Sequence, residues 1–345
     1  MGREVRILLA GLGNLGRRFC DLLADKGALV DARYGLRLAL VGAADSRGAA
    51  YDPGGLDPAA VSALKLAGET VGRLPGAGRV GWRAAELIAA AEADVLCEAS
   101  PVNLEQGGEP GLTHVRTALA RGMHVATPNK GPLVLAYGEL HDLAARHGAQ
   151  LRFDGTVAGG LPAINLGQRD LRGATVSRIE AVPNLCTGYV MDLLAAGLSW
   201  DAARERARAE GVLEGDGAFD LEGWDAAAKL VILVNAVMGV PARLEDVART
   251  GISGLDGATL RAARAAGQVY KLVATAERRA DGVGTVLRVV PTPLREGHFL
   301  ANLGAKQMGV IYHTDIYGTL MAAIDEPTPV PSAATMLRDV LDIFV

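Results

Sequence analysis

The sequence predicts an α/β fold in two parts, and two patterns of hydrophobic residues support this. The first part begins with a short apolar strand that leads through a glycine-rich turn into a helix, the order typical of parallel sheets. From about residue 161 the strands and helices follow the looser order of an α+β domain with a mixed sheet. An amphipathic helix after Pro331 ends the chain, and we expect its apolar face to pack on the first part. We therefore expect one domain at residues 1–155, completed by about 310–345, and a second at 156–309.

The composition excludes several classes of protein. Half of the 345 residues are hydrophobic, so a sizeable core can form, and the net charge of −4 offers no basic surface for nucleic acid. The cysteines, Cys20, Cys97 and Cys186, are far apart and odd in number, which favours a reducing cytoplasm without disulfides. The apolar run at the N-terminus is too short for a signal peptide or a membrane span, and glycines break it. We expect a cytoplasmic protein without nucleic-acid or membrane partners.

The turn after the first strand reads GLGNLG and is the first candidate binding site. This spacing, between a strand and a helix, is the dinucleotide-binding fingerprint. Gly11 permits the tight turn, Gly13 lets the backbone approach a pyrophosphate, and Gly16 lets helix and strand pack closely. Asn14 and Leu15 begin the helix, whose N-terminal N–H groups can bind phosphate. The first domain is therefore predicted to be a Rossmann-type domain that binds NAD or NADP.

The end of the second predicted strand, Leu36–Ala44, bears on the choice between these cofactors. Asp45 follows the strand, where an acidic residue binds the ribose 2′-hydroxyl of NAD. It lies further along the chain than usual, and a helical extension through residues 27–35 accounts for the delay. Arg47 could instead accept the 2′-phosphate of NADP. Asp45 favours NAD and Arg47 favours NADP, so the sequence leaves the choice open.

Two later strands of the first part, Asp94–Ala99 and His124–Ala126, end in polar residues. Ser100 follows the first of them, and Lys130 lies just beyond the second. Open α/β sheets bind ligands at the carboxyl ends of their strands, so we expect both residues to face cofactor or substrate. From position alone, Lys130 could equally be a solvated loop lysine.

The second part has predicted helices near 161–171, 191–211, 227–239 and 255–267, and predicted strands near 176–184 and 286–294.

An acidic stretch precedes the most apolar of these helices. It holds Glu214, Asp216, Asp220 and Asp225, and it ends in Lys229, four residues after the last aspartate. Residues i and i+4 share a helix face, and on a solvated face such an ion pair is common and weak. Here the sequence KLVILV follows, so this face leads into the interior. A lysine at the edge of a hydrophobic core needs an oppositely charged or hydrogen-bonding partner, and the pKa of such a lysine is easily shifted. These residues are our candidates for the chemistry.

Taken together, these motifs resemble those of the homoserine dehydrogenase family, over nearly the whole chain and without the regulatory C-terminal domain of some members. Six stretches agree in order: GLGNLG, Glu98-Ala99-Ser100, TPNKGP at 127–132, DGTVAGGLP at 154–162, EGVLEGDGAFDLEGWDAAAKL at 210–230, and the final helix. The fifth is the most specific. Its acidic residue, its two aspartates five apart and its lysine four further on fall on Glu214, Asp220, Asp225 and Lys229.

The resemblance implies a reversible, NAD(P)-linked oxidation of L-homoserine to L-aspartate 4-semialdehyde, with reduction of the aldehyde as the physiological direction. It also implies a homodimer formed through the second domain and a place in threonine and methionine biosynthesis. Lys229 would hold the reacting oxygen and take part in proton transfer, and Lys130 would lie near the same oxygen and the nicotinamide. Glu214 would bind the substrate ammonium, while Asp220 and Asp225 orient Lys229 and the substrate.

This chemistry is physically reasonable. Hydride leaves the alcohol carbon as the hydroxyl loses its proton, so the site needs a proton acceptor within hydrogen-bond reach. A cation also stabilises the developing alkoxide, and the cofactor carries out the hydride step.

The family also binds a structural monovalent cation such as Na⁺, largely through backbone carbonyls. By resemblance its ligands here would come from Asp154, Val157, Gly159 and Leu161. The acid is one methylene shorter than the family glutamate.

Three departures from the family fall near the expected substrate. The family N-G-T-T-N-Y becomes Asn184-Leu185-Cys186-Thr187-Gly188-Tyr189, in which Thr187 remains as a substrate contact. Val212 replaces a tyrosine, and residues 324–328, IDEPT, replace a glycine-rich loop. A leucine does not readily adopt positive φ, and lost hydrogen bonds alter discrimination between substrates. Two alternatives therefore stay open: a dehydrogenase for another hydroxy amino acid, and a cofactor-binding protein without turnover.

Overall fold

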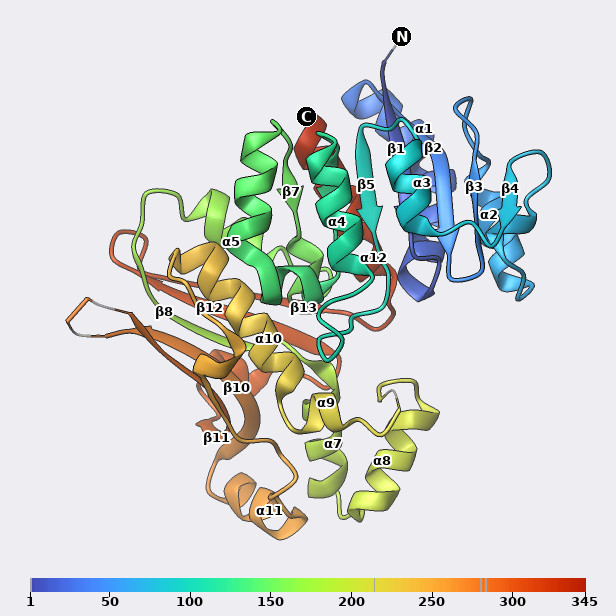
Figure 1. Ribbon diagram of the computed structural model, residues 1–345. Helices are drawn as coiled ribbons and strands as arrows, with labels where there is room; N and C mark the ends of the chain where they lie inside the picture. Colours follow the sequence, from blue (N-terminus) through green and yellow to red (C-terminus); the bar gives the residue numbers. More distant parts are fainter. Residues whose placement is uncertain (1, 214, 280, 283) are drawn as a thin grey trace. The chain divides into compact units, whose positions relative to one another are not determined.

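The chain forms two compact units in the computed structural model, which describes residues 2–213, 215–279, 281–282 and 284–345 (Figure 1). The first unit runs to Gly160 and resumes over Thr328–Val345, and the second is Leu161–Pro327. The first unit is therefore completed by the C-terminal helix. No helix in the described residues is long and apolar enough to cross a membrane.

The first unit is built on a sheet whose described strands have the order β4-β3-β2-β1-β5-β6-β7. The strands from β2 to β7 in this order are parallel, and β3 and β4 add an antiparallel edge. The strands are β1 (Arg3–Ala10), β2 (Leu36–Asp45), β3 (Gly48–Tyr51), β4 (Gly78–Val80), β5 (Val95–Glu98), β6 (His124–Ala126) and β7 (Leu151–Arg152). This is the parallel-rich sheet that the sequence predicted.

Most helices of this unit lie between its strands in the chain, and the last helix follows the second unit. They are α1 (Asn14–Tyr34), α2 (Pro58–Leu66), α3 (Ala84–Ala90), α4 (Gly111–Ala120), α5 (Lys130–Arg146) and α12 (Val330–Phe344), with short 3₁₀ turns at η1 (Val71–Arg73) and η2 (Asp154–Thr156). Helix α1 continues through the stretch predicted as an extension and ends at Gly35, whose φ of 66° lies in the left-handed region. This long helix explains why Asp45 comes so late in the chain.

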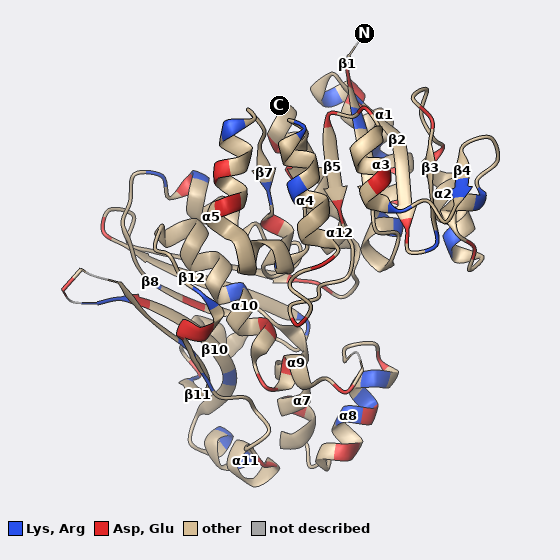
Figure 2. Ribbon diagram, in the orientation of Figure 1, with Lys and Arg blue, Asp and Glu red and all other residues tan. Residues whose placement is uncertain are grey.

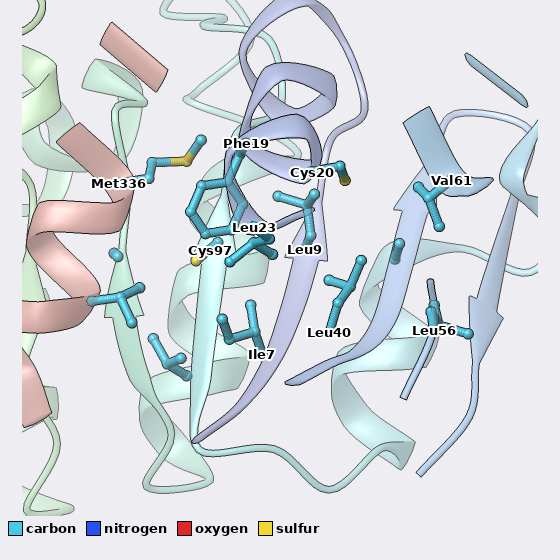
Figure 3. Close-up of a cluster of buried hydrophobic side chains, with 14 of the residues drawn as sticks. Ile7, Leu9, Phe19, Cys20, Leu23, Leu40, Leu56, Val61, Cys97 and Met336 are labelled. Atoms are coloured by element: carbon cyan, nitrogen blue, oxygen red, sulfur yellow. The ribbon is translucent and has the colours of Figure 1, made fainter. Parts of the chain in front are cut away.

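One hydrophobic core joins the helix α12 to the N-terminal strands (Figure 3). Ile7 and Leu9 of β1 and Phe19 of α1 are fully buried, and they belong to the same cluster as Met336 and Val340 of α12. Burying such side chains contributes roughly 1.5–3 kcal/mol each. The apolar face of the last helix is thus part of the first core.

The second unit contains a mixed sheet with the order β13-β12-β8-β10-β11-β9 in the described residues. All neighbouring pairs are antiparallel except β11 and β9. The strands are β8 (Val176–Val182), β9 (Val247–Arg249), β10 (Gln268–Arg278), β11 (Thr285–Arg295), β12 (Gln307–Thr314) and β13 (Thr319–Asp325).

The helices of the second unit are mostly short. They are α6 (Ala163–Asn165), α7 (Leu185–Ala195), α8 (Trp200–Ala209), α9 (Ala218–Leu221), α10 (Trp224–Leu233) and α11 (Gly257–Ala265), with π turns at η3 (Leu166–Asp170) and η4 (Val234–Met238) and 3₁₀ turns at η5 (Leu244–Asp246) and η6 (Phe299–Asn302). The predicted helix at 191–211 is two helices, α7 and α8, with Gly197 at φ +100° between them.

The boundaries differ from the predicted ones in one important respect. The chain returns to the first unit at Thr328 instead of at about residue 310. The reason is that β12 pairs with β8 and β13 pairs with β12, so both strands extend the second sheet. The first boundary falls at Gly160, five residues after the predicted one.

Candidate active site

The glycine-rich turn after β1 lies against the end of β5. Gly11 has φ of +95°, and a Cβ added to it would lie 2.4 Å from the carbonyl group of Ala99 and 2.5 Å from the Ser100 nitrogen. A Cβ on Gly16 would lie 1.8 Å from the Gly11 oxygen. Both positions therefore exclude any side chain, and the turn brings Gly11 and Ser100 together, as expected for the carboxyl edge of the sheet.

Gly13 has the opposite property, because its surroundings are open. A Cβ added to it would meet nothing within 4 Å, and its φ of −75° suits any residue. Gly13 is the N-cap of α1 and the helix has no side-chain cap and no acidic residue in its first turn. Asn14 and Leu15 begin this first turn. The N-terminus of α1 thus has backbone N–H groups that could donate hydrogen bonds to a phosphate.

The structure gives Asp45 a different role from the predicted ribose contact. Its side chain is 5% exposed, and its Oδ2 accepts from Lys65 Nζ at 2.6 Å. Thr70 Oγ1 donates to Oδ1 at 2.8 Å. The backbone N–H groups of Arg47, Gly48 and Val71 also donate to this carboxylate, at 2.8, 3.1 and 3.0 Å. A carboxylate has about four lone-pair sites, so no acceptor site is left for a ribose hydroxyl.

These contacts also set the charge of Asp45. Burial alone would raise its pKa, but the hydrogen bonds from Lys65, from the backbone and from Thr70 outweigh it, and the pKa is lowered. Asp45 is therefore an ionised structural residue that holds the β2–β3 turn. Arg47 beside it is exposed, and its Nη2 donates to the Gly68 oxygen at 2.6 Å.

A fully buried carboxylate that the sequence analysis did not single out lies under the carboxyl ends of β5 and β6. Glu98 is 0% exposed, and its Oε1 accepts from the Ser100 N–H at 3.0 Å. Asn129 Nδ2 donates to Oε2 at 3.0 Å, and His114 Nδ1 lies 3.3 Å from Oε1. Glu98 thus accepts hydrogen bonds from both Ser100 and Asn129, the residue before Lys130.

Lys130 is the first residue of α5 rather than a loop residue. Asn129 is the N-cap, and its Oδ1 accepts from the Gly131 N–H at 3.0 Å. The same asparagine donates to Glu98, so the start of α5 is fixed to the end of β5. Lys130 is half-buried at this point. Because Asn129 caps α5 and is bonded to the buried Glu98, the backbone of the next residue, Lys130, is held in one position.

In the second unit Asp220 lies on α9, and Asp225 and Lys229 lie on α10, where Figure 2 shows acidic residues and a basic residue further along α10. Lys229 Nζ lies 2.7 Å from Asp225 Oδ2 and donates to the Pro183 oxygen at 2.7 Å. The two side chains are 12% and 6% exposed. Lys229 and Asp225 therefore do not form the common, weak ion pair of a solvated helix face. The face that carries them is buried, as the apolar sequence after Lys229 indicated.

Asn184 joins this pair to Asp220 and was not among the predicted site residues. Its Nδ2 donates to Asp220 Oδ1 at 2.7 Å and to Asp225 Oδ2 at 2.6 Å. Its Oδ1 accepts from the Thr187 N–H at 3.2 Å, which caps α7. The spacing Asn-x-x-Thr before an apolar helix is the sequence signal that could have identified the cap. Asp220 and Asp225, to which the amide of Asn184 donates, lie 36 and 41 residues further along the chain, and no local pattern indicates these contacts.

The first turn of α7 adds two buried side chains beside these carboxylates. Thr187 is 1% exposed, and within the described residues its Oγ1 has no hydrogen-bond partner. Cys186 is 4% exposed, and burial, together with Asp220 and Asp225, raises the pKa of its thiol. The Cys186 thiol therefore stays protonated. Because the Thr187 hydroxyl has no partner among the described residues, it can form a hydrogen bond with a ligand.

The remaining predicted substrate contact, Glu214, lies outside the described residues. Asp216 is exposed and accepts from the Ala218 N–H at 3.0 Å, which makes it a turn residue.

The turn expected to bind a cation is bonded to α12 instead. Arg338 Nη2 donates to Asp154 Oδ2 at 2.6 Å, and Thr335 Oγ1 donates to the Gly159 oxygen at 3.1 Å. The Asp154 oxygen accepts from the Val157 N–H at 3.3 Å. Leu161, the last expected ligand, begins the second unit. An arginine already neutralises the acid, and the Gly159 and Leu161 carbonyls each already accept a hydrogen bond, so these residues fit a cation poorly.

Two of the departures are accommodated locally. Leu185 begins α7 with no positive φ, so leucine brings no backbone strain there. Asp325 ends β13, and the Glu326 N–H donates to the Lys306 oxygen at 2.8 Å, so this segment is the end of the second sheet rather than a loop.

Comparison with known proteins identifies the family. Residues 162–341 match the family "Homoserine dehydrogenase", and residues 11–154 match "Homoserine dehydrogenase, NAD binding domain". The chain belongs to the homoserine dehydrogenase family. This confirms the predicted resemblance and the class of an NAD(P)-dependent oxidoreductase that acts on a CH–OH group.

Relatives of this family cover the whole chain. A homoserine dehydrogenase of Methanocaldococcus jannaschii is 31% identical over 98% of both chains. An NAD(+)-dependent homoserine dehydrogenase of Pseudomonas canavaninivorans is 30% identical over 99% of this chain and 96% of its own. The crystal structure of a putative homoserine dehydrogenase from Archaeoglobus fulgidus has a TM-score of 0.87 and 29% identity, over 99% of each chain.

Proposed function

We propose that the chain oxidises L-homoserine reversibly to L-aspartate 4-semialdehyde, with NADP as the preferred cofactor. The observation that carries the proposal is the buried pair of Lys229 and Asp225, in which the ammonium has two acceptors. An ammonium has three N–H donors. Within the described residues Asp225 and Pro183 take two of them, so the third can bind the oxygen of a substrate.

When bound, the cofactor supplies the hydride acceptor or donor. Lys229 binds the substrate oxygen, and its positive charge stabilises the alkoxide that develops there. In the oxidation direction Lys229 first gives a proton to water and then takes up the hydroxyl proton, and in the reduction direction it gives a proton to the new alkoxide and regains one from water. Asp225 holds the ammonium in place through the 2.7 Å contact.

The other residues bind and orient. In the cofactor site, the backbone of Gly13, Asn14 and Leu15 binds the pyrophosphate, and Gly11 and Gly16 shape the turn that holds it. In separate roles, Lys130 and Ser100 serve the nicotinamide side, and Glu214 binds the substrate ammonium. Asp220 orients Lys229 and the substrate, and Thr187 offers its hydroxyl to the substrate. Thr187 Oγ1, which is buried and has no hydrogen-bond partner in the part of the chain that the structure describes, supports its role.

The preference for NADP rests on the charges at the end of β2. Lys65 neutralises Asp45, whose carboxylate is saturated, so the exposed Arg47 leaves this end positively charged. We expect Arg47→Ala to raise the Kd for NADPH about tenfold or more, since a hydrogen bond to a charged group contributes roughly 1.5–3 kcal/mol. The Kd for NADH should stay unchanged. Fluorescence titration with both cofactors measures this.

Arg37→Ala is the matched control, because Arg37 lies at the opposite end of the same strand and is exposed. Equal losses for NADPH and NADH in Arg47→Ala would contradict the assignment of Arg47 to the 2′-phosphate. Tighter binding of NADH than of NADPH by the wild type would contradict the preference itself.

The proposed reaction is tested by following NADP reduction at 340 nm (about the absorbance maximum of the reduced nicotinamide) with L-homoserine at alkaline pH. Turnover supports the proposal. Cofactor binding without turnover would favour the second candidate, a dehydrogenase for another hydroxy amino acid. The buried Cys186 beside Asp220 and Asp225 favours that candidate, because the family threonine hydroxyl is missing there.

The assembly is proposed to be a cytoplasmic homodimer formed through the second unit, with its product used in threonine and methionine biosynthesis. Exposed apolar side chains of the β12–β13 region support an interface, since Ile316 is 62% exposed, Tyr317 54% and Met321 52%. Light scattering that gives the mass of a monomer would contradict the dimer.

A further inference from the structure

Asn184 contacts three residues of the candidate site, and the proposed chemistry gives it no role. It is 7% exposed, and each polar atom of its amide is used. Nδ2 donates to Asp220 and Asp225, and Oδ1 accepts from the Thr187 N–H. The orientation of the amide is fixed, because a flip would turn its oxygen toward two carboxylates.

The contacts place Asn184 at the junction of three segments. Asn184 precedes α7, Asp220 lies in α9, and Asp225 lies in the first turn of α10. Asp220 Oδ1 and Asp225 Oδ2 are both within hydrogen-bond distance of one nitrogen, so the two carboxylates are near neighbours. Two like charges so close repel each other unless a donor lies between them.

Asp225 Oδ2 also binds Lys229, so one oxygen accepts from both the amide and the ammonium. A carboxylate oxygen held from two directions has little freedom to rotate. The position of the ammonium therefore depends on the amide as well as on Asp225. Hydrogen bonds with a charged partner are about twice as strong as neutral ones, and here they are shielded from water.

We propose that Asn184 is a positioning residue for the proposed reaction: its amide clamps Asp220 to Asp225 and so fixes Lys229 against the substrate oxygen. The inference rests on the proposed function. Asn184 does not touch the reacting atoms. It acts through Asp225, and its second task, capping α7, places Thr187 beside the same carboxylates.

The two tasks can be separated by substitution. Asn184→Asp and Asn184→Ser both keep a side-chain oxygen that can cap a helix about as well as asparagine does. Asp lacks the donor and adds a third negative charge. Ser is neutral but too short to bridge two carboxylates. Asp256→Ala, which removes the exposed N-cap of α11 in the same unit, is the control for the loss of a cap alone.

We expect both Asn184 variants to lower kcat for homoserine oxidation about 100-fold, the usual effect of misplacing a catalytic group by about 1 Å. The KM for NADP should stay near that of the wild type, while the melting temperature should fall, because the donor between the two carboxylates is lost. Asp256→Ala should lower the melting temperature and leave kcat unchanged. If Asn184→Asp does not fold because of its added charge, Asn184→Ser alone decides the matter.

Two results would overturn the inference, and they differ from each other. Wild-type kcat in a folded Asn184→Ser variant would show that the amide does no more than cap α7, while the proposed function would stand. A wild type that binds NADPH but does not oxidise L-homoserine would remove the proposed function, and this inference with it.

Discussion

Replacing Lys229 by alanine is expected to lower kcat for homoserine oxidation about 10³-fold, within the range found for loss of an acid–base group. The substitution removes the proton acceptor and the cation that stabilises the alkoxide. It also leaves Asp225, 4% exposed, without its ammonium partner. The carboxylate keeps the hydrogen bond from Asn184 but loses its cation, so we also expect a loss of stability of about 3 kcal/mol or less, at or below the usual cost of breaking a buried pair.

The measurement needs to separate chemistry from folding. Steady-state kinetics with L-homoserine give kcat, and fluorescence titration with NADPH reports whether the first unit still binds cofactor. Lys306→Ala is the matched control, since Lys306 is an exposed lysine of the same unit. We expect its kcat to equal that of the wild type. A folded Lys229→Ala variant that keeps more than about a tenth of the wild-type kcat would be inconsistent with an acid–base role.

The parts of the site that the sequence predicts are those that depend on neighbouring residues. The glycines at 11, 13 and 16 have roles that follow from strand, turn and helix in immediate succession, and the structure gives each glycine a different environment. The pairing of Asp225 with Lys229 is also local, because residues four apart share a helix face. Short-range geometry of this kind is present in the order of the residues.

The parts that the sequence does not predict depend on residues that are distant in the chain. Asp45 looks like a ribose ligand until Lys65 and Thr70, 20 and 25 residues later, saturate its carboxylate. Strands β10, β12 and β13 were not predicted, and with β12 and β13 the chain returns to the first unit later than expected. Strands β10 and β12 form by pairing with β8, and β13 forms by pairing with β12, and no local motif specifies which segments pair.

Two asparagines that sequence reasoning missed share one arrangement. Asn129 caps α5 with its amide oxygen and donates from its nitrogen to the buried Glu98. Asn184 caps α7 in the same way and donates to Asp225. Capping is visible in a sequence, but the carboxylate on the other side of the amide is not. In both units a helix that carries a candidate site residue in its first turn is thus anchored to a buried acid.

The glycine-rich turn gives the second large effect, and it separates stability from binding within six residues. Gly16→Ala places a Cβ 1.8 Å from the Gly11 oxygen, a contact that only a backbone shift can relieve. We expect the free energy of unfolding to fall by about 3 kcal/mol, the upper part of the usual range for overpacking. Loss of NADPH binding follows, because the turn that Gly11 forms against Ala99 and Ser100 is displaced.

Gly13→Ala should behave in the opposite way. The added methyl group meets nothing within 4 Å, and its backbone conformation suits alanine. Alanine is a poorer N-cap than glycine, so stability should fall by no more than about 1 kcal/mol. The methyl group would nevertheless occupy the space through which a pyrophosphate approaches the backbone, and we expect NADPH affinity to fall about 100-fold.

Urea denaturation and NADPH titration of the two variants test this contrast directly. If Gly13→Ala binds NADPH as tightly as the wild type, the pyrophosphate does not approach the backbone at this turn, and the cofactor site has been placed wrongly. If Gly16→Ala is as stable as the wild type, helix α1 can move away from Gly11 without cost. The close packing of strand and helix would then not be what the third glycine provides.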